Sequence, residues 1–328
     1  MSGSFPLRVR LLDETTSTND EVKHALAAGE DEGLVVRARR QTGGYGRQGR
    51  SWASPEGGLY ASLLLHPRVD AAVLPTLSLV ASVALREALV HFVPECEQGR
   101  VRIKWPNDII CLPPDGADGH TLEGPKDLSI EHDPANPSAD AGAHTLEGPG
   151  PVAPVLIAQD TTVRGQSSAL TFRKLCGISL ERYAGGVCLG MGVNVFAPDV
   201  SERVGGKNIP VYLAEFAESP DPVAHFRPVG PCAPFVESTD GFLDRVFAGI
   251  MEEFAPAYER WQAEGFAPFA ERYRERAALA GRFVRVMDRA GIVVTEGQAE
   301  GIDDDGRLML RASDGSLSPV QSGEVHLA

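Results

Sequence analysis

The spacing of apolar residues divides the N-terminal third of the chain into short strands and two helices. Apolar residues recur at helical spacing in 21–28, which Gly29 ends, and again in 74–93. Alternating or continuous apolar runs predict strands at 7–12, 34–38, 59–66 and 100–104. The chain is therefore expected to open with a strand, a loop and a helix, and the segment after residue 38 is expected to join two strands of one sheet.

The region from 172 to 279 continues this pattern with longer elements. Two apolar strands are predicted at 172–181 and 187–195, joined by a turn at Gly185-Gly186. Helices are predicted at 241–263 and 266–279. Strands followed by helices in this order are typical of an α+β domain.

The C-terminal tail is predicted to be all-β. Its turns at Ala290-Gly291, Asp305-Gly306 and Asp314-Gly315 are hairpin signals. They separate short strands expected at 283–287, 292–299, 308–311 and 317–320. We therefore expect two domains, residues 1–279 and residues 280–328.

Residues 113–170 interrupt the pattern of the first domain. They are rich in proline, glycine, alanine and serine and poor in large apolar residues, so we expect a disordered insertion. The insertion holds nine acidic and two basic residues, a net charge of −7, which is half of the −14 of the whole chain. The folded body is thus less acidic than the total suggests. A second loose segment is expected at 203–238.

The acidic composition limits the partners of the chain. With 328 residues, of which 43% are hydrophobic, the chain is long enough to bury a core. A sequence pI near 5.1 disfavours general binding to DNA or to an anionic membrane, since both need a broad basic face. The five cysteines show no zinc-ligand spacing, and no signal peptide or long apolar run is visible. We expect a cytoplasmic protein with reduced thiols, no structural metal, and neither DNA nor membrane as a partner.

A basic, glycine-rich loop at 37–52 departs from this acidic composition. It contains five arginines and four glycines and no acidic residue. Glycine lets backbone N–H groups approach a ligand closely, and arginine presents a planar, permanently charged set of donors that suits phosphate or carboxylate. The pattern indicates a site for a small anion, phosphate first, although a solvated arginine-rich loop would have the same composition.

The candidate chemistry lies in a few ordered segments. They are 14–19 (Glu-Thr-Thr-Ser-Thr-Asn), the basic loop with Gln41, 104–108 (Lys-Trp-Pro-Asn-Asp), and 174–178 followed by 190–195. In this order, and with the small β tail, the chain resembles the biotin protein ligases over nearly all of its length except the two loose segments. The resemblance implies an α+β fold with a mixed-sheet catalytic domain of the biotin/lipoate ligase type and a small C-terminal SH3-like β-barrel.

The resemblance also implies a two-step reaction. Biotin attacks the α-phosphate of ATP to give biotinyl-5′-adenylate and pyrophosphate, and a lysine of a biotin carboxyl carrier protein then takes the biotinyl group. ATP with Mg²⁺ and biotin are the implied ligands, the carrier protein of a biotin-dependent carboxylase is the implied partner, and the sequence leaves a homodimer open. The basic loop suits the first step, because negative charge builds on phosphorus. A flexible glycine loop could also keep water from the adenylate.

The resemblance to the family implies a role for each candidate residue that matches one of its motifs. Lys174 and Arg47 are the expected catalytic residues, which reach the biotin carboxylate and the phosphate. The residues expected to bind biotin are Ser17, Thr18, Asn19, Gln41, Tyr45, Gly46, Arg47, Lys174 and Gly177. The residues expected to bind ATP or the adenylate are Gly44, Arg47, Arg50, Lys104, Trp105, Asn107, Asp108, Gly192 and Asn194, with Asp108 as the candidate ligand of the nucleotide's Mg²⁺.

Several features depart from the family pattern or allow a purely structural role. Tyr45 stands where the family usually has another arginine, which puts tight retention of the adenylate in doubt. Residues 18–21 (Thr-Asn-Asp-Glu) also read as a capping box for the following helix. The acidic insertion parts Asp108 from Lys174, but a doubling of loop length costs only about 0.6 kcal/mol, so the site can still assemble. The thirteen residues before Glu14 leave no room for a DNA-binding helix-turn-helix.

Two other functions remain open at this point. A lipoate or octanoate protein ligase belongs to the same superfamily of folds, but the Lys-Trp-Pro-Asn-Asp motif and the β tail favour biotin. A catalytically weak biotin-binding module is conceivable because of Tyr45. The biotin ligase is the function that the sequence favours.

Overall fold

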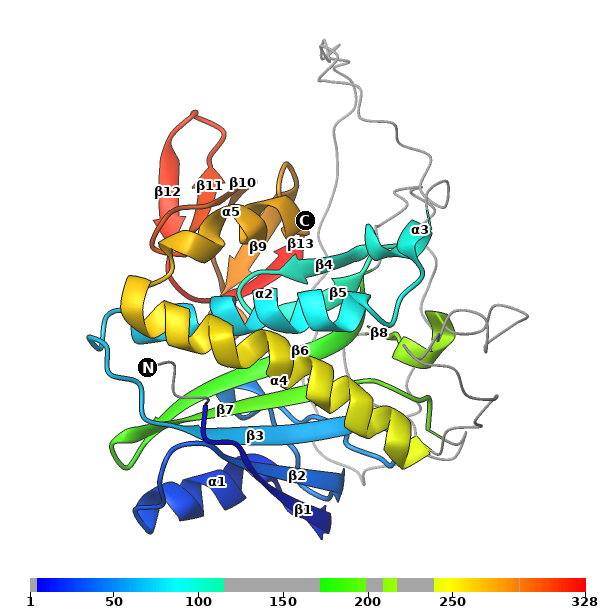
Figure 1. Ribbon diagram of the computed structural model, residues 1–328. Coiled ribbons are helices and arrows are strands. Elements are labelled where there is room, and N and C mark those ends of the chain that lie inside the picture. The colour runs from blue at the N-terminus through cyan, green and yellow to red at the C-terminus, as the bar shows by residue number, and fades with distance from the viewer. Residues whose placement is uncertain (1–4, 115–171, 199–208, 217–238, 289) are drawn as a thin grey trace, which may run out of the picture. The chain divides into compact units, whose positions relative to one another are not determined.

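The computed structural model describes residues 5–114, 172–198, 209–216, 239–288 and 290–328 (Figure 1). Residues 115–170 of the predicted insertion lie outside the described residues, as do 203–208 and 217–238 of the second segment expected to be loose. Residues 209–216 of that segment form strand β8 (Ile209–Pro210) and a 3₁₀ helix at Leu213–Phe216. The prediction is therefore wrong for these residues, because β8 finds a parallel partner in the main sheet.

A mixed sheet forms the body of the described chain. Its strands lie in the order β1-β2-β3-β7-β6-β5-β4, and β8 pairs with β6. The pairs β1–β2 and β6–β8 are parallel, and the other neighbours are antiparallel. The strands are β1 Arg8–Thr15, β2 Leu34–Gln41, β3 Leu59–Leu65, β4 Val101–Lys104, β5 Asp108–Cys111, β6 Arg173–Tyr183 and β7 Gly186–Val193. The predicted mixed-sheet α+β class is confirmed.

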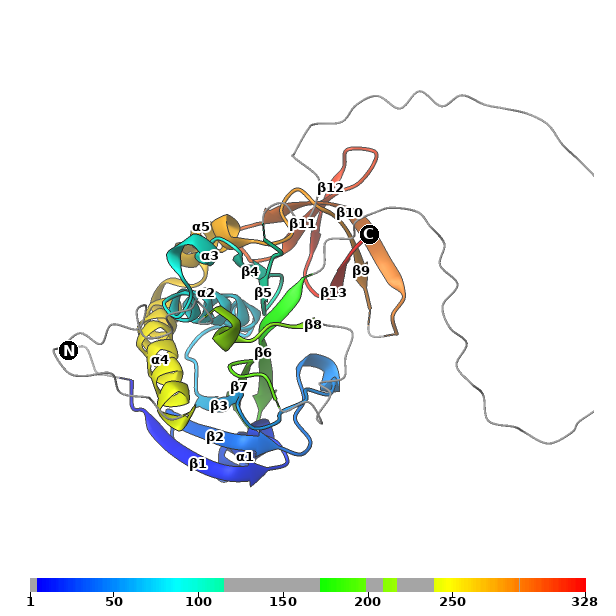
Figure 2. The ribbon, with the colours of Figure 1, turned by 90° about the vertical axis from the view of Figure 1, so that its right-hand side faces the viewer.

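Helices cover the sheet because successive residues of its strands enter two separate apolar clusters. On β2, Leu34 and Val36 join the cluster under α1 (Thr18–Ala27), whereas Val35 joins the cluster under α2 (Leu77–Val90) and α4 (Thr239–Glu264). Figure 2 shows α2 and α4 together against one face of the sheet. The short helices α3 (Glu95–Gln98) and α5 (Ala267–Arg276) complete the body.

The C-terminal tail forms a second, antiparallel sheet in the order β12-β11-β10-β9-β13. Its turns contain Gly291, Gly306 and Gly315 at φ of 79°, 79° and 84°, a conformation that favours glycine, as the hairpin prediction requires. The pattern missed the last strand, β13. The strands are β9 Phe283–Met287, β10 Val293–Ile302, β11 Leu308–Arg311, β12 Leu317–Val320 and β13 Glu324–Leu327.

The two sheets share one apolar cluster. Val284 and Leu308 of the C-terminal sheet belong to the same cluster as Ile103 of β4 and Tyr273 of α5. Trp105 connects the sheets by a polar contact as well, since its indole Nε1 donates to the carbonyl oxygen of Gly306 at 3.0 Å. The C-terminal sheet is therefore held in place beside the ends of β4 and β5.

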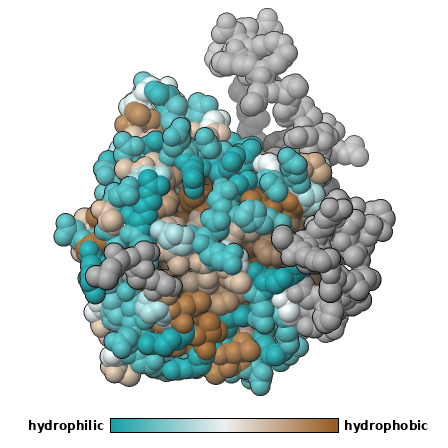
Figure 3. Space-filling view, viewed as in Figure 1, coloured by the Kyte–Doolittle hydropathy of each residue, from teal (hydrophilic) through white to brown (hydrophobic). Residues whose placement is uncertain are grey.

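The edge strand β1 exposes one apolar face. Leu7, directly before the strand, alternates with Val9 and Leu11 of the strand, and the three are 42%, 49% and 53% exposed. Figure 3 shows a brown band near the lower edge of the view, where Figure 1 draws β1. The opposite face of the strand contributes Leu12, which packs against the cluster under α1.

The buried face of α4 is a major part of the core. Phe254, Tyr258 and Trp261 are fully buried and stack in sequence, with ring centroids 5.9 Å apart in each pair. We predict that Phe254→Ala lowers the free energy of unfolding by about 3–5 kcal/mol, because it removes a large buried ring and leaves a cavity. Urea denaturation measures this loss. Glu252→Ala, an exposed position of the same helix, should change it by less than about 0.5 kcal/mol, and equal effects of the two variants would contradict this packing.

Candidate active site

A cavity of about 590 Å³ lies between α1, the basic loop, the ends of β4 to β7 and the C-terminal sheet. This volume is typical of a site for a small molecule. Segments that are far apart in the sequence meet here, as the sequence motifs predict. The predicted site residues that line it are Thr18, Asn19, Gln41, Tyr45, Gly46, Arg47, Arg50, Lys104, Trp105, Asn107, Asp108, Lys174, Gly177 and Gly192.

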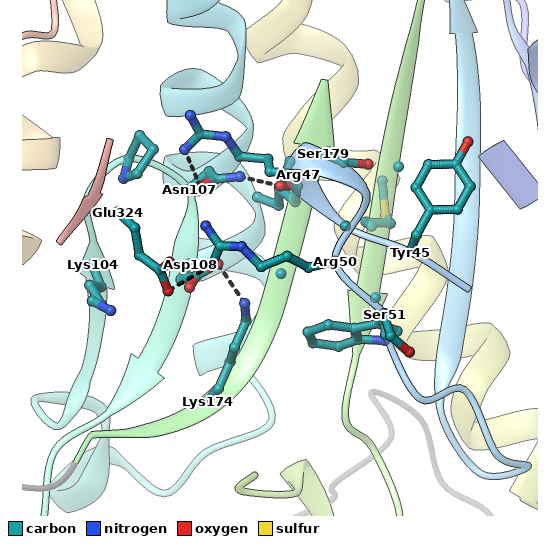
Figure 4. Close-up of a pocket in the computed structure, with 18 of the residues that line it drawn as sticks. Tyr45, Arg47, Arg50, Ser51, Lys104, Asn107, Asp108, Lys174, Ser179 and Glu324 are labelled. Carbon is teal, nitrogen blue, oxygen red and sulfur yellow. Dashed lines mark hydrogen bonds and ion pairs between the residues drawn. The ribbon is translucent and has the colours of Figure 1, made fainter. Parts of the chain in front are cut away.

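Four cationic side chains gather in one part of this cavity (Figure 4). Arg47 and Arg50 come from the basic loop, Lys104 from the end of β4 and Lys174 from β6. Because they come from separate segments, the fold has to hold their like charges together. We call this part the cationic end of the cavity.

Neighbouring polar groups offset part of this charge. Lys174 Nζ lies 2.8 Å from Asp108 Oδ1, and Arg50 Nη1 lies 2.7 Å from Glu324 Oε1 of β13. Arg47 donates to a neutral partner, the amide oxygen of Asn107, at 3.3 Å. Asn107 is itself oriented by β6, since its Nδ2 donates to the carbonyl oxygen of Ile178.

Burial leaves two of these cations poorly solvated. Desolvation lowers the pKa of Lys104 below its ordinary value, and the nearby charge of Asp108 offsets this only in part. Desolvation likewise lowers the pKa of Arg47, although a guanidinium stays protonated in any case. A buried cation that has lost its hydration and lacks a full counter-charge in the protein is stabilised when an anion binds beside it. The cationic end is therefore suited to phosphate or carboxylate.

The opposite part of the cavity is lined by neutral hydrogen-bonding groups. The backbone N and the Oγ1 of Thr18 donate to Gln41 Oε1 at 2.8 and 3.0 Å. Asn19 donates to Ser179 Oγ at 3.2 Å and accepts from Ser62 Oγ at 2.7 Å. These contacts fix the direction of each amide and hydroxyl. We call this part the neutral end, and its uncharged donors and acceptors suit a polar but neutral group.

Trp52 forms part of the cavity wall, and the Lys174 ammonium lies 5.0 Å from its ring centre. An added Cβ at Gly192 would lie 2.7 Å from its Nε1, and one at Gly177 would lie 3.0 Å from its ring, so both positions need glycine for the indole to pack on β6 and β7. The indole Nε1 is buried and has no hydrogen-bond partner in the described part of the chain. An unpaired buried N–H is costly, and beside a cavity it indicates that a ligand supplies the acceptor.

Three predicted site residues do not line the cavity but hold residues that do. Gly44 lies so close to the loop's other strand that a Cβ there would meet Ser54 Oγ at 2.5 Å. Asn194 Nδ2 donates to the carbonyl oxygen of Lys174 at 2.9 Å and so fixes the backbone that carries this lysine. Ser17 is buried as the N-cap of α1.

The capping box predicted at Thr18–Glu21 is not formed. The N-cap is Ser17, with no side-chain cap hydrogen bond. The hydroxyl of Thr18 is bound to Gln41 instead, and Glu21 accepts from Thr15 Oγ1 at 2.8 Å. Thr18 therefore uses its hydroxyl at the neutral end of the cavity and does not cap α1.

Sequence reasoning missed several lining residues. Trp52 ends the basic loop, and its position directly after this glycine-rich segment could have marked it as a candidate site residue. Ser179 would have been found by extending the alternation of β6, since it lies two residues after Gly177. Glu324 had no local signal, because its contact with Arg50 exists only once the C-terminal sheet has docked.

Comparison with known proteins agrees with this geometry. The model of the biotin/lipoate A/B protein ligase family matches residues 11–124, and that of the biotin protein ligase C terminal domain matches residues 280–327. A biotin--[acetyl-CoA-carboxylase] ligase of Paracoccus denitrificans is 30% identical over 311 residues, which cover 93% of this chain and 95% of the relative. The chain belongs to the biotin protein ligase family. The resemblance drawn from the sequence motifs is confirmed.

More distant members of the family extend the comparison. A bifunctional ligase/repressor of Bacillus subtilis is 25% identical, covering 96% of this chain and 72% of the relative. The structure of a biotin protein ligase from Aquifex aeolicus in complex with biotin and ATP shares 20% of its sequence, covers 98% of both chains and superposes with a TM-score of 0.61. This biotin protein ligase therefore shares the fold of that enzyme.

Two searches of the described residues concern metals and membranes. No group of three or more His, Cys, Asp or Glu residues there could hold a metal ion. None of the described helices is long and apolar enough to span a membrane.

The two lysines of the cationic end should respond differently to the same substitution. We predict that Lys104→Met raises the free energy of unfolding of the ligand-free protein by up to about 1 kcal/mol, because it removes a charge that burial destabilises. Lys174→Met should lower it by about 1 kcal/mol, because Asp108 loses its partner at 2.8 Å. Urea denaturation at neutral pH measures both changes. A loss of stability with Lys104→Met would show that Lys104 is well compensated in the absence of ligand.

Proposed function

We infer that the protein is an ATP-dependent biotin protein ligase, which converts biotin into biotinyl-5′-adenylate and transfers it to a lysine of a biotin carboxyl carrier protein. Its membership in the family supports this, as does the likeness to a biotin--[acetyl-CoA-carboxylase] ligase over 93% of the chain. The observation that carries the chemistry is the division of one cavity into a neutral end and a cationic end. A ligand with a polar neutral head and an anionic tail fits this division, and biotin has both.

The first step joins two anions. The carboxylate oxygen of biotin attacks the α-phosphorus of ATP, and the bond between that phosphorus and the bridging oxygen of the pyrophosphate leaving group breaks. We assign Arg47 and Lys174 to the reacting carboxylate and phosphate, because their fixed positive charges offset the repulsion and the charge that builds on phosphorus. Thr18 and Asn19 of the neutral end would hold the ureido ring and so set the position of the carboxylate.

The second step transfers the biotinyl group to nitrogen. The unprotonated amine of the carrier's lysine attacks the acyl carbon, the acyl–phosphate bond breaks, AMP leaves, and the new amide loses a proton. The same cations stabilise the phosphate of the departing AMP. Trp52 and the basic loop would cover the mixed anhydride and exclude water until the carrier arrives.

ATP fits the cationic end, and Asp108 is the proposed protein ligand of its Mg²⁺. Magnesium keeps several waters and commonly takes one or two carboxylates together with phosphate oxygens, so a single carboxylate suffices. When bound, the ion neutralises phosphate charge. In the described structure Asp108 is paired with Lys174, and this pair has to open for each residue to reach the nucleotide.

The remaining partners and the location are proposals as well. The carrier protein of a biotin-dependent carboxylase is the proposed acceptor, and the cytoplasm is the proposed location. We propose no DNA partner. A homodimer stays a prediction that analytical ultracentrifugation would test.

One experiment tests the reaction and its specificity. The purified full chain is mixed with ATP, Mg²⁺ and biotin, lipoate or octanoate, with and without a candidate carrier, and pyrophosphate release and adducts are followed by enzymatic assay and mass spectrometry. Biotin should give the adenylate and a biotinylated carrier lysine. Pyrophosphate release with lipoate or octanoate but not with biotin would overturn the proposal in favour of a lipoate-type ligase. Binding of biotin without any adenylate would identify a silent module.

The assigned cations can be tested within this assay. We predict that Arg47→Ala and Lys174→Ala each slow adenylate formation at least tenfold, or about 1.4 kcal/mol, because each removes a charged donor from the reacting phosphate. Arg260→Ala, which alters an exposed ion pair on α4, should leave the rate unchanged. Wild-type rates in both site variants would contradict the assignment.

A further inference from the structure

Within residues 45–50 of the basic loop, three side chains contact different neighbours. Arg47 contacts Asn107 and Arg50 contacts Glu324, both within the cavity. Tyr45 turns the other way, and its hydroxyl donates to Asp20 of α1 at 2.7 Å. Figure 4 shows the Tyr45 hydroxyl directed away from the cations.

These attachments respond differently to an anionic ligand. Arg47 and Arg50 hold the loop through the same guanidinium groups that would bind phosphate, so their present contacts compete with the ligand. The contact of Tyr45 uses no cation of the cavity. It can therefore persist while the two arginines exchange partners.

Tyr45 belongs to a network that joins the loop to both α1 and the main sheet. Lys23 of α1 donates to the Tyr45 hydroxyl at 2.7 Å and forms an ion pair with Glu181 of β6 at 2.5 Å. The ammonium lies 5.0 Å from the ring centre, so it sits beyond the hydroxyl edge and not over the ring face. Asp20 and Lys23 lie one helical turn apart and thus share a face of α1.

A phenol matches this position closely. Its single hydroxyl donates to a carboxylate and accepts from an ammonium at the same time, which arginine cannot do because it has no acceptor. Burial and then the hydrogen bond to Asp20 raise the pKa of Tyr45 to about 12, so the hydroxyl keeps its proton at neutral pH. Burial would lower the pKa of Lys23, but its hydrogen bonds to Glu181 and Tyr45 outweigh burial and raise it, so the donor stays charged.

The loop separates two hollows of the protein. Tyr45, Gly46 and Arg47 line both the ligand cavity and a second hollow of about 680 Å³, whose other wall includes Glu181 and Met287. A loop that swings away from α1 would join the two. A displaced loop would thus open a route by which a bound intermediate could leave.

We propose that Tyr45 is a positioning residue that keeps the basic loop seated through Asp20 and Lys23 while Arg47 and Arg50 exchange their protein partners for phosphate, and that it thereby retains the adenylate. This rests on the proposed biotin ligase function. Tyr45 does not touch the reacting atoms in this scheme. Its loss should affect retention of the intermediate more than the rate of its formation.

The test compares Tyr45→Phe with Tyr258→Phe. Tyr258 also donates its hydroxyl to a carboxylate, Glu32 at 2.6 Å, but it lies in the core on α4. Tyr45→Phe should release adenylate about tenfold faster, because it removes two charge-assisted hydrogen bonds. The readouts are free biotinyl-5′-adenylate and biotin on a bystander protein such as albumin. The fold-increase in adenylate release by Tyr45→Phe should exceed the fold-change in the kcat of adenylate formation at saturating substrates, and Tyr258→Phe should release adenylate at the wild-type rate.

A double-mutant cycle separates this role from general destabilisation. Asp20→Ala should also speed release, and adding Tyr45→Phe should speed it by a smaller factor than in the wild type, because both variants break the contact between Tyr45 and Asp20. Asp20→Asn, which keeps an acceptor for the hydroxyl, should restore most of the retention. Wild-type retention in Tyr45→Phe, or effects of Tyr45→Phe and Asp20→Ala that multiply in the double variant, would overturn the proposal.

A readout that needs no enzymatic activity distinguishes this outcome from failure of the proposed function. Limited trypsin digestion of the full chain, mapped by mass spectrometry, reports cleavage after Arg47 and Arg50. Tyr45→Phe should be cut there faster than wild type and Tyr258→Phe should not, while cleavage after the exposed Arg285 stays unchanged. Equal loop cleavage in all three proteins would overturn the positioning role even if no ligase activity were found.

Discussion

The repulsion among four cations in one cavity is the constraint on which the rest of this structure depends. Arg47, Arg50, Lys104 and Lys174 gather where only part of their charge is matched by paired carboxylates. Such a cluster forms only if packing elsewhere compensates for it, because like charges in a partly dry site repel more strongly than in water. The core beneath α2 and α4 and the close packing of the two sheets supply that compensation. The unbalanced charge is then available to bind phosphate.

The shape of the cavity depends on backbone as much as on charge. Gly177 and Gly192 lie opposite one another on paired strands, and both leave room for the indole of Trp52. Trp52 therefore packs against the sheet at these two glycines. A ligand that spans both ends would have its reacting group positioned by side chains held on the sheet. The cations favour an anionic ligand, and the two ends together limit the length of that ligand.

The sequence predicted most of this arrangement because its signals are local. Strand alternation, the turns at Gly291, Gly306 and Gly315, and the order of the motifs each depend on near neighbours in the chain, and the structure has the corresponding elements. Other strands and contacts were not predicted from the sequence. Strands β5 and β13 were not predicted, although β4, β11 and β12, which are equally four residues long, were. The contact between Arg50 and Glu324 and the capture of the Thr18 hydroxyl by Gln41 arise from tertiary neighbours, which no window along the chain contains.

The position of Tyr45 shows how one departure from a charge pattern can be compensated. Another arginine at this position would add to the repulsion among the cations. Tyrosine instead makes the loop less positive by one charge and places a neutral hydroxyl between Asp20 and Lys23. Lys23 stands behind the hydroxyl, and its charge is balanced by Glu181. Contacts made by the arginines change when phosphate arrives, but the contact of the Tyr45 hydroxyl with Asp20 uses no cation of the cavity and need not change. A loop that must both bind an anion and stay in place gains from dividing these tasks between arginine and tyrosine.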